Sequence, residues 1–295
     1  MSRARPMIFG EVLFDRFPDG SAVLGGAPFN TAWHLQGFGA EPVFVSRVGA
    51  DAAGERVRQA MQDWGMETAA LQTDPRHATG AVDVSLVDGE PHYRIDPDQA
   101  YGHIEPARLD RFDAPALLYH GSLALWNQAS RQALETLVQR FGAPIFLDVN
   151  LRAPWWSAAD VTAWMDRAAW VKLNRDELDR LEPEGADTVE RALRLCRRRG
   201  LRRLVVTLGR DGALAVDAQG ARETVQPVAA VDVVDTVGAG DAFASVLMLG
   251  LLSGWELAAT LRRAQEFASA IVGVHGATVT DRGFYQRFLT AWDAR

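Results

Sequence analysis

The sequence predicts an α/β fold in which helices cover both faces of a mainly parallel sheet, and a small antiparallel sheet stands apart from it. Short apolar runs alternate with amphipathic stretches over most of the 295 residues. Such alternation is typical of right-handed βαβ units, which build parallel sheets. In two places it gives way to turn-linked segments without helices, which favour antiparallel strands. We expect a single domain over residues 1–295.

The apolar runs have the length of buried strands and are bounded by polar residues or glycine. Strands covered by helices on both sides are apolar throughout, because neither of their faces meets water. The expected strands cover residues 7–14, 42–48, 116–120, 144–149, 169–173, 203–208 and, as a valine-rich run, 224–234.

The stretches between these runs carry apolar residues at helical spacing. In residues 55–64, Val57, Ala60, Met61 and Trp64 stand at i, i+3, i+4 and i+7, which places them on one face of a helix. Further helices are expected over residues 130–141, 188–199 and 242–252.

The small sheet is predicted from two segments that break the alternation. After Asp15 the chain turns at Pro18-Asp19-Gly20, and residues 81–95 alternate in polarity around a turn at Asp88-Gly89. Such a sheet could close over a cleft, or pair with a second copy of the chain to protect its edges. The segments expected to form it lie near 11–24 and 80–100.

Composition excludes several classes of protein. The net charge of −7 argues against a nucleic-acid partner, because phosphates need a basic face. A single cysteine, Cys196, permits no internal disulfide and suits a reducing cytoplasm. The residues before Gly10 are too polar for a secretory leader, and no apolar run reaches the roughly 18 residues of a membrane span. We expect a cytoplasmic protein.

Polar residues follow several of the expected strands, where parallel α/β sheets collect their ligands. They are Asp15, Asn150 and Arg152 in LDVNLR, Asn174 and Glu177 in VKLNRDEL, and Thr207 to Gly212 in TLGRDG. All would lie on one rim of the sheet. Each also has an ordinary structural interpretation, and Asn174 with Glu177 has the i, i+3 spacing of a helix capping box.

The segment DTVGAGDAFAS places Asp241 where Gly238 and Gly240 leave the backbone bare, at the predicted start of an apolar helix. Free N–H groups of a glycine turn and a helix N-terminus form a cradle for a phosphate. We expect these amides to favour the charged form of Asp241, leaving it ionised at neutral pH and able to accept a proton. The alternative is that Asp241 only caps its helix.

Three kinds of phosphate site compete for this segment. A Walker A motif does not occur anywhere in the sequence. The dinucleotide fingerprint of a nicotinamide-dependent oxidoreductase fits loosely at Gly238, Gly240 and Ala244, but Glu256 lies in a helical stretch rather than after a second strand. A small-molecule kinase needs a phosphate cradle, a base, magnesium support and a hydroxyl-binding surface. LGGAPFNTAWHL, with its glycine pair and Asn30, is the candidate for that surface.

Together these motifs resemble the ribokinase-like (PfkB) family of carbohydrate kinases, in the right order over nearly the whole chain. The segment DTVGAGDAF matches the family signature. The matching motifs are Gly25-Gly26 with Asn30, VSRVGADAAG at 45–54, DVNLR at 148–152, KLNRDEL at 172–178, VTLGRDG at 206–212 and DTVGAGDAF at 235–243.

The resemblance implies a three-layer ribokinase-like sandwich with a small β-sheet lid, and transfer of the γ-phosphate of ATP to a sugar hydroxyl. Asp241 would be the general base, and the amides of Gly238, Ala239, Gly240 and Asp241 would hold the transferring phosphoryl group. Asp15, Gly25, Gly26 and Asn30 would bind the sugar, with Arg94 and Asp96 as further contacts on the lid. Asn174 and Glu177 would support Mg²⁺, partly through water, while Asn174, Thr207, Gly209, Gly212 and Gly240 would line the nucleotide site.

The resemblance also implies a possible K⁺ site at Asp235, Val237 and Gly276, and a possible homodimer through the lid. The N-terminal third and the segment 148–152 look most like bacterial fructokinases, which makes fructose 6-phosphate the expected product. Ribose, 2-keto-3-deoxygluconate and a nucleoside stay open as substrates, because hydroxyl discrimination depends on pocket geometry.

Overall fold

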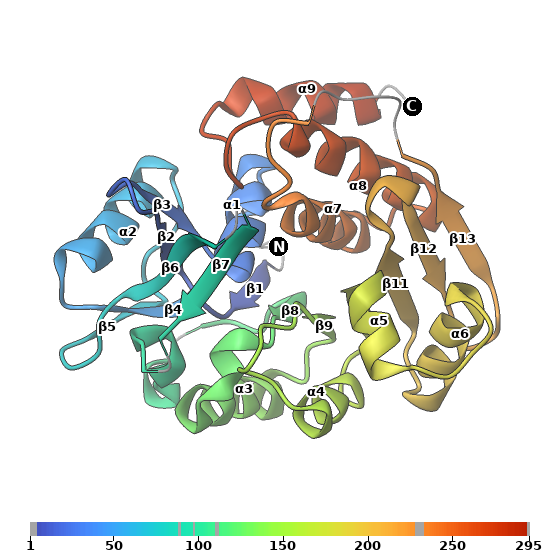
Figure 1. The fold of residues 1–295 in the computed structure, drawn as a ribbon, viewed down its shortest axis with the longest axis horizontal. Coiled ribbons are helices and arrows are strands. Elements are labelled where there is room, and N and C mark those ends of the chain that lie inside the picture. The colour runs from blue at the N-terminus through green and yellow to red at the C-terminus, as the bar shows by residue number, and fades with distance from the viewer. Residues whose placement is uncertain (1–4, 88–89, 97, 110–111, 228–232, 294–295) are drawn as a thin grey trace.

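The computed structural model describes residues 5–87, 90–96, 98–109, 112–227 and 233–293. A nine-stranded sheet forms the centre, in the order β13-β12-β11-β10-β9-β8-β1-β4-β5 (Figure 1). Its strands are Pro6–Phe9 (β1), Val43–Gly49 (β4), Leu71–Asp74 (β5), Leu117–His120 (β8), Ile145–Asp148 (β9), Trp170–Asn174 (β10), Arg203–Thr207 (β11), Ala213–Val216 (β12) and Arg222–Val225 (β13).

The sheet is parallel from β5 to β11, and β12 and β13 are added antiparallel at one edge. The carboxyl ends of β1, β8, β9, β10 and β11 therefore point the same way and form one rim. The predicted mainly parallel sheet is confirmed.

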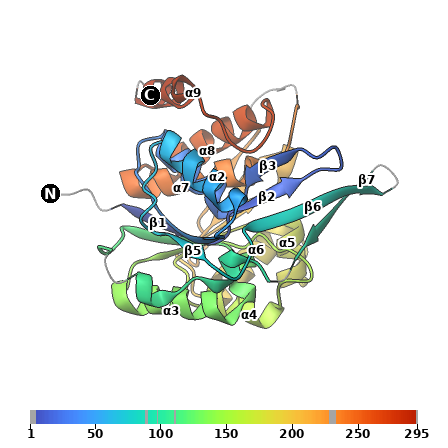
Figure 2. The same cartoon turned by 90° about the vertical axis from the view of Figure 1, so that its left-hand side faces the viewer.

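Helices cover both faces, and neighbouring residues of one strand enter different cores. Ile8 packs with α1, α2, α7, α8 and α9, whereas Met7 and Phe9 pack with α3, α4, α5 and α6. Figure 2 shows these two helical layers above and below the sheet. The helices are Ala27–Gly37 (α1), Ala52–Asp63 (α2), Gln128–Phe141 (α3), Ala158–Met165 (α4), Arg175–Leu181 (α5), Thr188–Arg198 (α6), Ala239–Ser253 (α7), Leu257–Val272 (α8) and Arg282–Asp293 (α9), with short 3₁₀ turns at Ala100–His103 (η1), Pro106–Arg108 (η2), Leu123–Trp126 (η3) and Gly209–Asp211 (η4).

A second sheet of four strands, in the order β3-β2-β6-β7, extends to one side of the body (Figure 2). Its strands are Leu13–Arg16 (β2), Ala22–Gly25 (β3), Gly80–Val87 (β6) and Glu90–Ile95 (β7). Both hairpins are antiparallel as expected, but β2 and β6 pair in parallel. We call these four strands the small sheet.

Two expected strands are corrected. Residues 7–14 form parts of two strands in different sheets, because the backbone breaks at Gly10, where a Cβ would collide with Pro28. The run 224–234 is strand only as far as Val225; residues 228–232 lie outside the described part, and Val233 and Val234 are exposed and not in a strand. The expected turn at Asp88-Gly89 also lies outside the described residues.

Across the described ranges, every helix is too short or too polar to cross a membrane.

Candidate active site

The N-terminus of α7 meets the rim of the large sheet at a glycine turn. Gly238 has φ of +80°, and a Cβ there would collide with Ala277, so only glycine fits. No side chain caps α7 within the described chain. Asp241 lies in the first turn of α7, as predicted, but the capping interpretation is wrong. Within the described chain, the N–H of Ala239 donates to the carbonyl of Thr236 over 3.5 Å, and the amides of Gly240 and Asp241 are left for another acceptor.

Asp241 is tied to α1 through a side-chain hydrogen bond. Asn30 donates from Nδ2 to Oδ2 of Asp241 over 2.8 Å. Asn30 is only 4% exposed, and its Oδ1 atom has no partner among the described residues. Buried amide oxygens normally accept a hydrogen bond, so this atom is available to a hydroxyl donor from a bound molecule.

The protonation of Asp241 follows from burial rather than from the helix amides. Burial raises the pKa of Asp241 to about 6, although the hydrogen bond from Asn30 acts to lower it. The expectation that amides would favour the charged form is thus wrong in its cause. The carboxyl still ionises below neutral pH, and a base whose pKa lies near the working pH suits proton abstraction.

Asp15, Gly25 and Asn30 come together beside Asp241. A Cβ built on Gly25 would lie 3.6 Å from Oδ2 of Asp15 and 3.8 Å from Oδ1 of Asn30. At Gly26, φ is +110° and a Cβ would stand 2.9 Å from the carbonyl oxygen of Glu11. The glycine pair thus lets the chain pass close to two polar side chains. Burial also raises the pKa of Asp15.

Arg94 does not join this group, although the sequence placed it among the sugar contacts. In the small sheet, Asp15 stands opposite Val82, which stands opposite Ile95, so Arg94 belongs to the other face of β7. Arg94 is 73% exposed and pairs with Asp83 at 2.6 Å. Asp96 follows β7 and lies 3.7 Å from Arg94. The alternation of side chains along a strand explains the misplacement.

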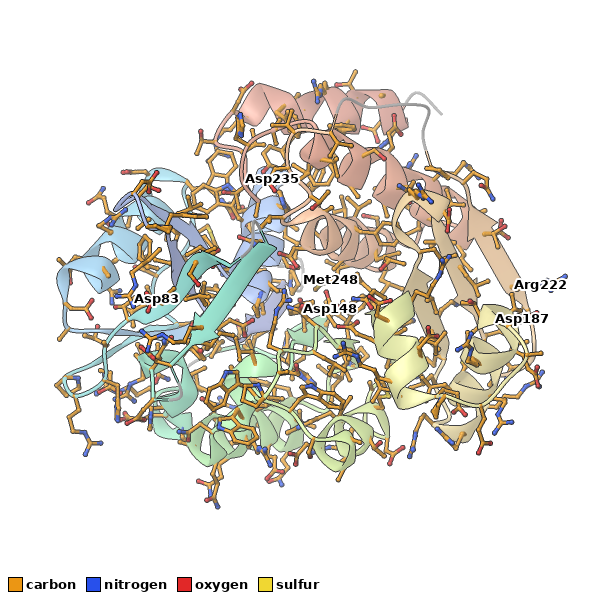
Figure 3. The ribbon with its side chains drawn as sticks, viewed as in Figure 1. Asp83, Asp148, Asp187, Arg222, Asp235 and Met248 are labelled. Carbon is orange, nitrogen blue, oxygen red and sulfur yellow. The ribbon has the colours of Figure 1, made fainter. Side chains whose placement is uncertain are left out.

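A buried ion pair that sequence reasoning missed lies on the large sheet beneath the glycine turn. Lys172 donates from Nζ to both carboxylate oxygens of Asp148 at 2.9 Å, and the two residues are register partners on β10 and β9. Figure 3 labels Asp148 near the centre of the molecule. A Cβ on Gly240 would lie 3.5 Å from this Nζ, so the ammonium faces the turn. A lysine in an apolar strand, with an aspartate ending the strand before it, was the available signal.

The environment of Lys172 keeps it charged. Burial acts to lower its pKa, but the attraction and hydrogen bonds of Asp148 outweigh burial and raise it. The glycine turn therefore combines free helix amides with one fixed cation, an arrangement that favours an anionic group.

Asn174 and Glu177 form the capping box of α5, so that alternative is confirmed. Oδ1 of Asn174 accepts from the N–H of Glu177, and Oε2 of Glu177 accepts from the N–H of Asn174. The other oxygen, Oε1, accepts from the N–H of Leu151 at 2.7 Å. The Glu177 carboxyl thus joins the ends of β9 and β10 at the rim, and burial raises its pKa.

The segment after β11 is held against the antiparallel edge. Gly209 and Gly212 have φ of +59° and +87°, and a Cβ on Gly212 would collide with the carbonyl of Val225. Thr207 ends β11, and its hydroxyl is 3.5 Å from the carbonyl oxygen of Leu173. The predicted nucleotide segment is therefore a tight turn next to the start of α5, on the same rim.

Asp235, Val237 and Gly276 are brought together from two loops. Oδ1 of Asp235 accepts from the N–H of Val237 at 2.9 Å, and Oδ2 accepts from the N–H of Gly276 at 3.2 Å. Figure 3 labels Asp235 on the side of the molecule where α9 lies. One carboxylate thereby connects the loop before α7 to the loop after α8.

Two more charged residues lie near Asp15 and Asp241: Glu11, which sequence reasoning missed, and Arg152, which it placed on the rim without a role. Glu11 is 2% exposed, its Oε2 has no partner within the described chain, and burial raises its pKa to about 7. The positive charge of Arg152 lowers the pKa values of Glu11, Asp15 and Asp241, so it lies near all three acids. Glu11 follows Gly10 just after β1, and that position on the rim was the only available signal.

Comparisons with known proteins agree with this arrangement. The model of the pfkB family carbohydrate kinases matches residues 9–282. The chain belongs to the PfkB family of carbohydrate kinases. Family membership makes the chain a carbohydrate kinase and sets aside the nicotinamide-dependent oxidoreductase that the glycine turn alone left open.

Curated relatives of this PfkB kinase include two with different substrates in their names. Aminoimidazole riboside kinase of Salmonella typhimurium is 33% identical over 238 residues, covering 77% of this chain and 73% of the relative. A fructokinase of Klebsiella pneumoniae is 31% identical over 264 residues, covering 83% of each. The names of these two relatives therefore do not decide between a sugar and a riboside as substrate.

A solved structure is similar to this kinase over nearly its whole length. A double mutant of Vibrio cholerae fructokinase, bound to fructose, ADP and a potassium ion, has a TM-score of 0.83 and 27% identity, and covers 98% of this chain and 99% of its own. The α/β ribokinase-like fold predicted from the sequence is confirmed.

Proposed function

We propose that this kinase transfers the γ-phosphate of ATP to the 6-hydroxyl of fructose, with Asp241 as the general base. One observation carries the proposal: Asp241 lies in the uncapped first turn of α7 and accepts a hydrogen bond from Asn30, whose amide oxygen has no partner among the described residues. An anion-binding surface and a hydroxyl-binding surface thus meet at one carboxylate. Phosphoryl transfer to an alcohol needs this combination.

In the proposed reaction, Asp241 accepts the proton of the sugar hydroxyl while the hydroxyl oxygen attacks the γ-phosphorus. The new O–P bond forms as the bond between the γ-phosphorus and the bridging oxygen breaks, and ADP leaves with the electron pair. A pKa of about 6 leaves Asp241 mostly ionised at pH 7 and still basic enough to take the proton. The hydrogen bond from Asn30 holds the carboxylate in place.

We assign the phosphoryl side of the site to the turn from Gly238 to Asp241. Its amides would hold the equatorial oxygens of the transferring group, because Gly238 and Gly240 keep Cβ atoms out of the way. Lys172, whose ammonium faces Gly240, adds a fixed positive charge. The nucleotide would lie along Asn174, Thr207, Gly209 and Gly212.

We assign the sugar side to Asp15, Gly25, Gly26 and Asn30. Asp15 offers two acceptor oxygens, and Asn30 offers the free amide oxygen, so both suit hydroxyl groups. The small sheet would act as the lid over the sugar and exclude water during transfer. Its exposed Phe17 and Val23 suit contact with a second copy of the chain, so we infer that any homodimer forms through this sheet.

The residues also suit two metal ions. Each oxygen of Glu177 accepts one backbone N–H and keeps a second lone pair, which suits a hydrogen bond to Mg²⁺-bound water beside Asn174. Asp235, with the carbonyls near Val237 and Gly276, offers the oxygen ligands that K⁺ requires. Bound Mg²⁺ would neutralise charge on the phosphates.

Fructose is preferred over the alternatives because fructokinases recur among the relatives and the solved structures. A specific observation favours a riboside as the second candidate. Aminoimidazole riboside kinase is 33% identical, slightly more than the fructokinase of Klebsiella pneumoniae at 31%. Ribose and 2-keto-3-deoxygluconate are further small polyols of the same chemical class.

The test is ADP release by the purified chain with ATP and Mg²⁺, measured with fructose, ribose, 2-keto-3-deoxygluconate and aminoimidazole riboside. We expect kcat/KM to be highest for fructose, and phosphorus NMR of the product to show a 6-phosphate. A higher kcat/KM for the riboside would move the assignment to the second candidate. Absence of ADP release with every acceptor, with or without K⁺, would refute the kinase assignment for this site.

A further inference from the structure

We propose that His77, Asp98 and His103 form a binding site for a borderline divalent cation, with Zn²⁺ as its representative, at the base of the small sheet. The three side chains can each offer one ligand atom, and these atoms lie within 4.8 Å of one another. The inference does not depend on the kinase activity or on its substrate.

The three residues come from both ends of one hairpin. His77 stands just before β6, whereas Asp98 and His103 follow β7. The hairpin β6–β7 extends away from the body together with the hairpin β2–β3 (Figure 2). A cation held by these side chains would therefore tie together the segments through which the hairpin joins the body.

The distances from the carboxylate of Asp98 to the two imidazoles are close to those of a tetrahedral metal site. Oδ1 of Asp98 lies 2.7 Å from Nε2 of His103 and 3.6 Å from Nε2 of His77. Ligand atoms of a tetrahedral zinc site with bonds of about 2.1 Å are about 3.4 Å apart. The two separations bracket that value.

His77 is already oriented as a metal ligand by a second carboxylate. Its Nδ1 lies 2.9 Å from Oδ2 of Asp74, whose other contacts are all donors: Arg47 and the amides of Arg76 and His77. A carboxylate surrounded by donors accepts from Nδ1 of His77, so the other ring nitrogen, Nε2, is the one that faces Asp98.

This arrangement has the chemistry of a carboxylate–histidine–metal relay. Nε2 of His77 and Oδ1 of Asp98 face each other over 3.6 Å, and a divalent cation between them could take both atoms as ligands. Two imidazoles and one carboxylate are the ligand types that zinc accepts readily.

His103 completes the set. Its ring stacks on His77 with the centroids 3.6 Å apart and the planes within 6°, so the two rings would have to tilt apart for both nitrogens to bind one cation. Its Nε2 now lies within hydrogen-bond distance of Asp98, and cation binding would require the imidazole proton to be on Nδ1 instead. Because Asp98 is 69% exposed, water can reach the cation as a fourth ligand.

The surrounding charges do not oppose the site. Arg47 lies next to Asp74, but it is paired with Asp74 at 2.9 Å and with Glu105 at 2.7 Å. Its charge is therefore balanced by two carboxylates, and Asp98 contributes a third negative charge at the site itself.

The experiment measures Zn²⁺ binding to the untagged, metal-free chain by isothermal titration calorimetry, with ZnCl₂ as the only added ligand. We expect about one ion per chain for the wild type. Asp98→Asn and His103→Gln should each weaken binding at least tenfold, because each removes one ligand. His275→Ala is the matched control, since His275 is an exposed histidine elsewhere on the chain, and it should bind like the wild type.

A second measurement separates this site from scattered surface binding. Zn²⁺ should slow amide hydrogen exchange in β6 of the wild type and not of Asp98→Asn, in which the substituted side chain is 69% exposed and outside the core. Wild-type affinity no higher than that of Asp98→Asn, or equal weakening by His275→Ala, would overturn the proposal. Folding of each variant is checked by its thermal transition without metal.

Discussion

The rim of the large sheet and the small sheet both carry ion pairs, but the two regions surround them differently. At the rim, the side chains of Lys172 and Asp148 are 7% and 2% exposed. On the small sheet, Asp83 pairs with Arg16 and Arg94, whose side chains are 50% and 73% exposed (Figure 3 labels Asp83). Removing one partner of a buried pair leaves an uncompensated charge in the interior, whereas water replaces a lost partner at the surface.

The difference in burial indicates that the charged side chains with fixed positions lie at the rim of the large sheet. The rim holds its charges in fixed positions, through register partners, capping bonds and a hydrogen bond between α1 and α7. The ion pairs of the small sheet are exposed to water, which suits the lid that we propose it forms. Four substitutions test this contrast, beginning with the largest expected effect.

Asp241→Asn should lower kcat by about 10²- to 10⁴-fold, because the amide cannot accept the hydroxyl proton. Steady-state kinetics with fructose and ATP would measure it. Glu55→Gln is the matched control, since Glu55 is an exposed acid in the first turn of α2, and it should keep wild-type kcat. An Asp241→Asn variant with more than a tenth of wild-type kcat would contradict the role of base.

Lys172→Met should lower the free energy of unfolding by about 3–5 kcal/mol, because it leaves the buried carboxylate of Asp148 unpaired. Urea denaturation would measure the change. The double variant Lys172→Met with Asp148→Asn should recover part of the loss, since it removes both charges. A loss below about 1 kcal/mol in the single variant would place this pair with the exposed ones.

Glu11→Gln should stabilise the chain at pH 8 by about 1–3 kcal/mol and leave it unchanged below pH 4. The folded-state pKa of Glu11 is about 7, raised from 4.5 by burial. The folded state therefore binds more protons than the unfolded state between these values, and stability falls as pH rises through that window. Urea titrations at several pH values would measure the difference, and Glu55→Gln should show no such slope.

Arg94→Gln should leave the free energy of unfolding close to that of the wild type, because its pair with Asp83 is exposed to water and salt. Its place on the face of β7 opposite to Asp15 also predicts a fructose KM within about twofold of the wild type. A tenfold rise in KM would show that Arg94 reaches the sugar when the small sheet closes. The functional contrast between the rim and the small sheet would then not hold.

The sequence was sufficient for the parts of the fold that depend on local patterns. Alternating apolar runs predicted the parallel sheet, and helical spacing predicted α2, α3, α6 and α7 to within a few residues. Local chemistry also identified the glycine turn at Gly238, where φ is +80°, because glycine is the residue that adopts such a backbone conformation readily. The motifs identified the family for the same reason, because each is a short segment that requires a particular backbone conformation.

The tertiary structure decided what depends on contacts between distant segments. Asn30 meets Asp241 across 211 positions of the chain, and Lys172 meets Asp148 only because β9 and β10 are neighbours. Register decided that Arg94 faces away from Asp15. Burial raised the pKa values of Asp241 and Glu11, and a sequence does not contain burial. Local conformation is set by adjacent residues, whereas the solvation and partners of a charge are set by the whole fold.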